Sequence, residues 1–216
     1  MRLIQAAACM LAAALLTGCA TTDTDHFYTL GGNAAAPAAA ASAAAASAAA
    51  PSAAAASAVA PSAAPVYIEM LAVNVPAQVK RKQLVVITGA GQVDLLEHHR
   101  WIGPLADEIG HALSQQVSAE LGAIDVYRTP YPAGATPWRI STNIQRFESA
   151  PGSYALVDAT WSVRRVGSDT VLTCRSVLRE PVGPGYEALV AGHRAALAKL
   201  GNAIAAAVRK GAVGSC

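Results

Sequence analysis

Aromatic and charged side chains are scarce in this chain of 216 residues. Only 5% of the residues are aromatic and 14% are charged, and 16 Lys and Arg stand against 14 Asp and Glu. The resulting formal net charge of +2 gives no electrostatic attraction for nucleic acid and no polybasic contact with a membrane surface. We therefore expect no nucleic-acid partner.

The sequence also lacks the short motifs of common enzymes and metal sites. It contains no G-x-S-x-G, C-x-x-C or nucleotide-binding fingerprint. His98 and His99 are adjacent on an extended segment, so their side chains point to opposite faces and do not share a metal. Asp107 and Glu108 lie at helical spacing from His111, but no third ligand completes the pattern. We expect no catalytic residue, no cofactor and no metal, which favours a binding or assembly role.

No apolar run near the N-terminus is long enough to span a bilayer. The run at residues 4–16 follows Arg2 and reaches about two-thirds of the ~20 residues that a spanning helix needs. The order of a charged residue, an apolar run and small residues is typical of a secretory signal peptide. We predict that residues 1–18 are removed as this leader.

Residues 16–19, Leu-Thr-Gly-Cys, resemble a bacterial lipobox. The resemblance implies cleavage after Gly18 and acylation of Cys19 with three chains, which exceeds the roughly two signals that stable anchoring needs. The alternative is an ordinary signal peptide with a chance cysteine. Ala20 is not an aspartate, and this is similar to sequences sorted to the outer membrane. We therefore expect a lipid-anchored protein on the periplasmic face of that membrane.

Two of the four cysteines remain after processing. Cys9 leaves with the leader and Cys19 carries the lipid, so Cys174 and Cys216 lie in a compartment that permits disulfides. We predict that they pair, and the chain-entropy formula gives on the order of 4 kcal/mol for the loop they would close. The alternative is a buried Cys174 with a free terminal thiol.

The segment at residues 31–65 is almost wholly Ala, Ser and Pro. Such a composition cannot bury enough varied apolar surface to fold alone. It separates a lipidated N-terminus at residues 19–30, whose residues 27–30 form a candidate edge strand, from one folded domain at residues 66–216. If the candidate strand pairs with the domain, the segment is an intradomain loop. If it does not, the segment is a long tether, and the family resemblance given below favours the loop.

The remaining pattern predicts strands and two helices. Apolar residues recur every four positions from Leu105 to Leu121, and a second apolar stripe, including His193 at the margin of the core, runs through residues 186–210. Strands are expected at 66–75, 84–88, 92–97, 138–144, 155–163 and 171–179, the last three as an antiparallel meander. Its outer face is typical of a solvated sheet face and carries Arg139, Arg164, Arg175 and Arg179. We predict an α+β, two-layer domain in which two amphipathic helices pack on one largely antiparallel sheet.

Five motifs carry a resemblance to a known family. They are the lipobox, Phe-Tyr-Thr-Leu at 27–30, Val-Asn-Val-Pro at 73–76, Arg-Trp-Ile-Gly-Pro-Leu at 100–105 and Gly-Tyr at 185–186. In this order and spacing the chain resembles the PqiC-like auxiliary lipoproteins of ABC-type, MCE-containing lipid transport systems. The resemblance implies a non-enzymatic, outer-membrane lipoprotein that docks an MCE-domain tunnel protein, forms a homo-oligomeric ring and supports envelope integrity.

The same resemblance directs attention to the entry of the first helix. Trp101, Pro104 and Leu105 are tentative partner-binding residues, although a Trp before a helix-starting Pro commonly packs over the first turn. The alternative function is a periplasmic lipoprotein that binds a lipid or small ligand between helices and sheet. The many alanines of the second helix suit close packing better than a roomy pocket. A hydrolase with an unfamiliar site is the third class.

Overall fold

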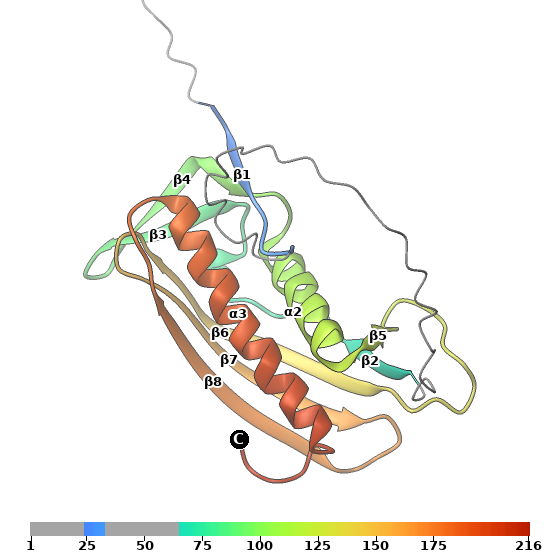
Figure 1. Ribbon diagram of the computed structural model, residues 1–216. Coiled ribbons are helices and arrows are strands. Elements are labelled where there is room, and N and C mark those ends of the chain that lie inside the picture. Colours follow the sequence, from blue (N-terminus) through green and yellow to red (C-terminus); the bar gives the residue numbers. More distant parts are fainter. Residues whose placement is uncertain (1–23, 33–64) are drawn as a thin grey trace, which may run out of the picture.

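A computed structural model describes residues 24–32 and 65–216. The predicted leader, the lipobox with Cys19 and most of the Ala/Ser/Pro segment lie outside the described residues. The elements form two sheets and two helices, and Figure 1 shows both helices lying over the larger sheet. The predicted α+β, two-layer architecture is confirmed.

The larger sheet has five strands in the order β5-β2-β6-β7-β8. Its strands are β5 (Ala123–Asp125), β2 (Val66–Met70), β6 (Trp138–Ala150), β7 (Tyr154–Arg165) and β8 (Val171–Pro181). The predicted meander is present, because β7 pairs antiparallel with both β6 and β8. β2 is shorter than expected and runs parallel to β5 and β6.

The smaller sheet has three strands in the order β1-β4-β3. The predicted hairpin is formed by β3 (Gln83–Gly89) and β4 (Gln92–Trp101), which follow the short 3-10 helix η2 (Ala77–Val79). β1 (His26–Tyr28) lies parallel to the last residues of β4, with Tyr28 opposite Trp101. The single sheet expected from the sequence is thus divided in two, because β4 pairs with β1 rather than with a strand of the meander.

Both helices bury one apolar stripe against the larger sheet. In α2 (Leu105–Leu121) the predicted four-residue repeat is buried from Leu105 to Val117, and Gly122 ends the helix in the left-handed conformation at φ 60°. In α3 (Tyr186–Arg209) the buried stripe faces β7 and β8. The helices also pack closely on each other, since a Cβ added at Gly201 would lie 2.6 Å from Cγ of Gln116. This contact leaves no room at Gly201 for a larger side chain.

Candidate functional site

Residues 26–30 are built into the fold. Beyond the pairing of β1 with β4, the Tyr28 hydroxyl hydrogen-bonds Nδ1 of His99 at 2.9 Å, and Leu30 is only 3% exposed. The hydroxyl of Thr29 and the backbone N–H of Leu30 both donate to the Glu108 carboxylate of α2, at 2.7 and 2.9 Å. These contacts fix the segment to the first turn of α2.

A second set of contacts joins the same segment to α3. The Arg194 guanidinium donates two hydrogen bonds to the carbonyl oxygen of Thr29, at 2.6 and 3.0 Å. The His99 ring, which lies 4.8 Å from the ring of His26, also packs at 4.3 Å from Tyr186 at the start of α3. Through these contacts β1 is part of the same fold as the strands that follow residue 65.

The tentative partner-binding residues separate into core and surface. Trp101 is 3% exposed and Leu105 is 2% exposed, whereas Pro104 is exposed at the start of α2. Trp101 meets the rings of Phe147 and His193 edge-on at 6.2 and 6.5 Å. This burial favours the alternative in which Trp101 packs over the first turn of α2, and Pro104 is the member of the set whose side chain is accessible to a partner.

His193 lies deeper than the predicted margin of the core. It is fully buried, stacks on Phe147 at 3.9 Å and has its Nε2 2.8 Å from the Ser149 hydroxyl. Its Nδ1 has no hydrogen-bond partner. Burial lowers the pKa of His193 to about 3, so the ring is neutral at ordinary pH. It is a structural group beneath the contact between the two sheets.

Cys174 and Cys216 form a disulfide in the structure, with their Cα atoms 5.7 Å apart. Cys174 lies on the inner face of β8, and the residues after α3 bring Cys216 back to this strand. The bond ties the C-terminus of the chain to an edge strand of the larger sheet.

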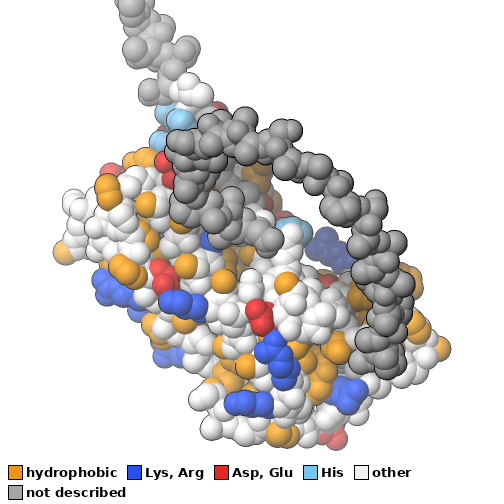
Figure 2. Space-filling view, in the orientation of Figure 1, with side chains coloured by type: hydrophobic (Ala, Val, Ile, Leu, Met, Phe, Trp, Pro, Cys, Tyr) orange, Lys and Arg blue, Asp and Glu red, His pale blue; other side chains and the backbone are white. Residues whose placement is uncertain are grey.

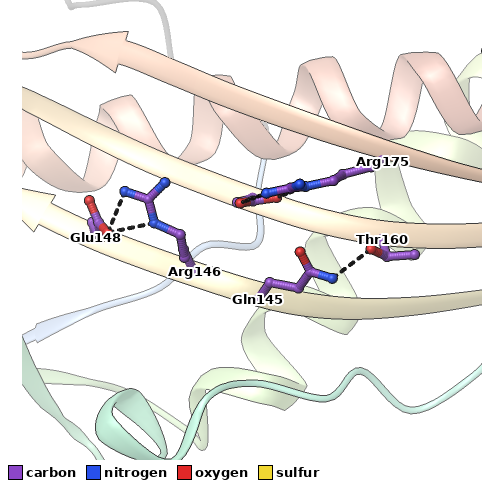
Figure 3. A network of polar contacts seen from close by, with 6 residues as sticks. Gln145, Arg146, Glu148, Thr160 and Arg175 are labelled. Carbon is purple, nitrogen blue, oxygen red and sulfur yellow. Dashed lines mark hydrogen bonds and ion pairs between the residues drawn. The ribbon is translucent and has the colours of Figure 1, made fainter.

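The outer face of the larger sheet, away from the helices, is rich in arginine. Its most buried charge is Asp158, which is fully buried and receives two hydrogen bonds from Arg175 at 2.9 and 2.8 Å. These hydrogen bonds hold the pKa of Asp158 below its usual range. Figure 3 shows the neighbouring pairs, in which Arg146 bonds Glu148 and Gln145 bonds Thr160.

We name this surface the arginine face. Cross-strand register places on it five arginines and three carboxylates, namely Arg139, Arg146, Arg164, Arg175, Arg179, Glu69, Glu148 and Asp158. Arg139 pairs with Glu69 at 2.6 Å, and the Arg179 guanidinium lies 3.7 Å from the centre of the Tyr154 ring. Since every carboxylate on this face already has an arginine, the surplus charge is positive.

The outer face of the smaller sheet is apolar instead. Four exposed side chains lie on it, and we name them the apolar face: Phe27, Val93, Leu95 and Ile102. They are 58%, 58%, 42% and 63% exposed. The inner face of the same strands carries buried residues such as Leu84 and Trp101. Figure 2 shows hydrophobic side chains over the region of β3 and β4.

The hollows of the described surface are modest. A groove of about 580 Å³ lies between α2 and α3, with five alanines among its eleven lining residues, and one of about 460 Å³ lies beside α2, β2 and β5. A smaller slot of about 210 Å³ lies between the β3–β4 hairpin and β6, with Val79, Val85 and Phe147 in its wall. Within residues 24–32 and 65–216, no group of three His, Cys, Asp or Glu side chains could hold a metal.

A comparison with protein families identifies the family of this chain. Residues 47–205 match the model of the ABC-type transport auxiliary lipoprotein component. The chain belongs to this family. The matched residues run from before β2 into α3 and contain every strand of the two sheets except β1. No curated protein matches the chain.

Solved structures are similar in fold. The crystal structure of an uncharacterized protein covers 67% of this chain and 98% of its own length, with 17% identity and a TM-score of 0.56. A protein from Xanthomonas campestris covers 65% of this chain and 81% of its own, with 13% identity and a TM-score of 0.49. The first of these structures shows that another protein has a fold similar to that of this chain.

Family membership indicates a membrane-anchored lipoprotein of the cell envelope that serves the partner proteins of an ABC-type transport system. Neither helix in the described part of the chain is long and apolar enough to cross a membrane.

Proposed function

We propose that this auxiliary lipoprotein is anchored in the outer membrane through lipid on Cys19, faces the periplasm and docks the end of an MCE-domain tunnel protein. It acts by contact and without catalysis, as a homo-oligomeric ring that helps lipid pass between the membranes and supports envelope integrity. The docking of the N-terminal segment into the fold supports this proposal most strongly.

The position of β1 limits how far the domain can lie from its anchor. Residues 20–25 separate Cys19 from β1, and seven extended steps span at most about 25 Å. A free coil from residue 20 to residue 65 would instead let the domain move ~35 to 40 Å away. An anchored domain at a nearly constant height suits a component that must meet the end of another protein.

The arginine face is the surface that we assign to the tunnel protein. It is built on the three longest strands, and its excess of arginines suits an acidic partner surface. Arg164 and Arg179 have no carboxylate partner among the described residues, so their charges are available to such a partner.

Capture of the tunnel protein from cells tests the proposal. The lipidated protein with Arg164→Ala and Arg179→Ala should retain its anchor and lose most of the captured MCE protein. The matched control replaces Lys199 and Arg209, whose ion pairs with Glu180 and Glu120 lie on the helix side of the molecule. Equal capture by both variants would exclude the arginine face as the docking surface, and no capture by the wild type would reject the MCE partner.

The alternative function, a lipoprotein that binds a lipid or small ligand, is favoured by one observation. The slot between the β3–β4 hairpin and β6 has an apolar wall and opens beside Arg146. Its volume of about 210 Å³ is below the usual range of drug-sized ligand sites. Native mass spectrometry of detergent-extracted protein separates the two, because a carrier retains a stoichiometric lipid, whereas the proposed assembly shows a ring.

A further inference from the structure

We propose that the apolar face of the three-stranded sheet rests on the bilayer that holds the lipid anchor, with Phe27 and Ile102 in the interfacial region of the membrane. The inference rests on the proposed function in one respect, the acylation of Cys19. It adds an orientation, because it names the side of the domain that contacts the membrane.

The register of β1 and β4 brings the two side chains together. Phe27 lies opposite Arg100, so Phe27 and Ile102 are diagonal neighbours on one face, within reach of each other. The alternate residues His26, Tyr28, His99 and Trp101 lie on the opposite face, toward α3. The exposure of Phe27 and Ile102 is therefore a property of the strand pairing, not of a loose terminus.

Leu95 and Val93 extend this face along β4, and at Val93 the face borders the slot between the β3–β4 hairpin and β6. Both are opposite β3 residues of the same kind, since Leu95 faces Val85 and Val93 faces Ile87. Of the ten large hydrophobic side chains that are exposed in the described part of the chain, four lie on this one face. Such a concentration on the small sheet indicates an interaction surface rather than scattered exposure.

The length of chain before β1 identifies the bilayer as the occupant. The lipid on Cys19 is at most about 25 Å along the chain from His26, so the first strand of the apolar face can reach the membrane that holds the lipid. Interfacial segments combine apolar side chains with cations at their border. Arg100 supplies a cation at that border, and the Asp25 carboxylate lies 3.9 Å from the Arg100 guanidinium and 3.0 Å from His98 Nδ1.

Depth-dependent fluorescence quenching tests this orientation. The mature, lipidated protein carries one environment-sensitive label through Phe27→Cys or Ile102→Cys and is inserted in vesicles of phosphatidylethanolamine and phosphatidylglycerol with brominated acyl chains. Both labels should lose most of their emission relative to vesicles without bromine. A label introduced by Val171→Cys, at an exposed valine on the outer face of β8, is the control and should be unchanged.

The outcomes distinguish this inference from the proposed anchor. If the protein floats with the vesicles and all three labels behave alike, the membrane orientation is wrong while the anchor stands. Cross-linking between copies of the Phe27→Cys variant would likewise overturn it, because a second copy would then cover the face. If the wild type does not float, or if Cys19→Ala floats equally well, the proposed anchor fails and the orientation fails with it. Unchanged melting temperatures of the labelled variants show that each label reports on the native fold.

Discussion

The three-stranded and five-stranded sheets differ in what their outer faces present to the surroundings. On the five-stranded sheet, each outward carboxylate is paired with an arginine, and Asp158 is buried beneath Arg175. On the three-stranded sheet, four large apolar side chains are exposed, whereas the five-stranded sheet exposes Val171 and Val177 among its charged side chains. A polar sheet face is stable in water, whereas an apolar one gains from being covered. The comparison shows that one small domain carries two surfaces of different chemistry, the arginine face and the apolar face, which suit different partners.

The two sheets meet at Trp101, so the largest expected effect comes from removing this side chain. Trp101→Ala deletes the contact of β4 with Phe147 of β6 and should lower the free energy of unfolding by about 3 to 5 kcal/mol. Urea denaturation measures the change. Ile102→Ala, one residue further along and 63% exposed, is the control and should stay within about 0.5 kcal/mol of wild type. Equal effects would mean that Trp101 does not join the sheets.

The next largest loss of stability is expected on the arginine face, at the ion pair of Asp158 and Arg175. Arg175→Ala leaves the buried Asp158 carboxylate without its partner and should cost about 3 kcal/mol, the low end for a buried pair, because the arginine itself is exposed. The Asp158 pKa is lowered in the fold, so the pair stabilises above the ordinary carboxyl pKa and the difference should vanish as acid protonates Asp158. Arg164→Ala, which removes no ion pair, should be nearly neutral. An equally stable Arg175→Ala would show that the arginine face does not depend on this pair.

Acid should weaken the junction between the sheets through His193. Its folded pKa of about 3 is below the ordinary value, so the unfolded chain binds the proton first and stability falls as the pH drops from about 6.5 toward 3. The loss should reach about 2 kcal/mol over the first two pH units. His193→Phe should flatten this part of the curve from urea denaturation at several pH values. An unchanged slope would assign the acid sensitivity to another group.

The smallest expected loss of stability distinguishes two neighbouring residues of β1, Tyr28 and Phe27. Tyr28→Ser removes a half-buried ring and its hydrogen bond to His99, and it should cost about 1 kcal/mol in thermal or urea unfolding. Phe27→Ser changes only the exposed face and should leave the fold unaffected in solution. A neutral Tyr28→Ser would show that β1 adds nothing to the domain and would restore the long tether.

Local patterns predicted the elements but not their grouping. The alternation in β6, β7 and β8 and the four-residue repeat of α2 are properties of neighbouring residues, so they can be read from a single sequence. The pairings of β1 with β4 and of β2 with β6 join distant segments, and no short pattern encodes them. For this reason one sheet was expected where the structure has two.

The candidate site was predictable in the same uneven way. Residues 27–30 were expected as an edge strand from the family resemblance, and the two aromatics and a leucine before a stretch without any made the segment conspicuous. Asp158 gave no sign of its burial, since it occupies an outward position of β7 that alternation assigns to solvent. Trp101 and Leu105 were tentatively assigned to a partner from resemblance alone, which does not report accessibility. Val93 and Leu95 alternate with Asp94, a signal that could have revealed an apolar outer face.

The orientation of β1 also has a mechanical consequence. A pull on the N-terminus acts along β1, and the parallel pairing with β4 must then slide as a unit rather than open one residue at a time. After the strand, Leu30 is buried, and Thr29 forms hydrogen bonds with Glu108 and Arg194. These contacts resist displacement of β1 along β4. A slip of one residue would also turn Tyr28 outward and Phe27 inward. Tension from the envelope would thus be passed to the whole domain instead of peeling away its first strand.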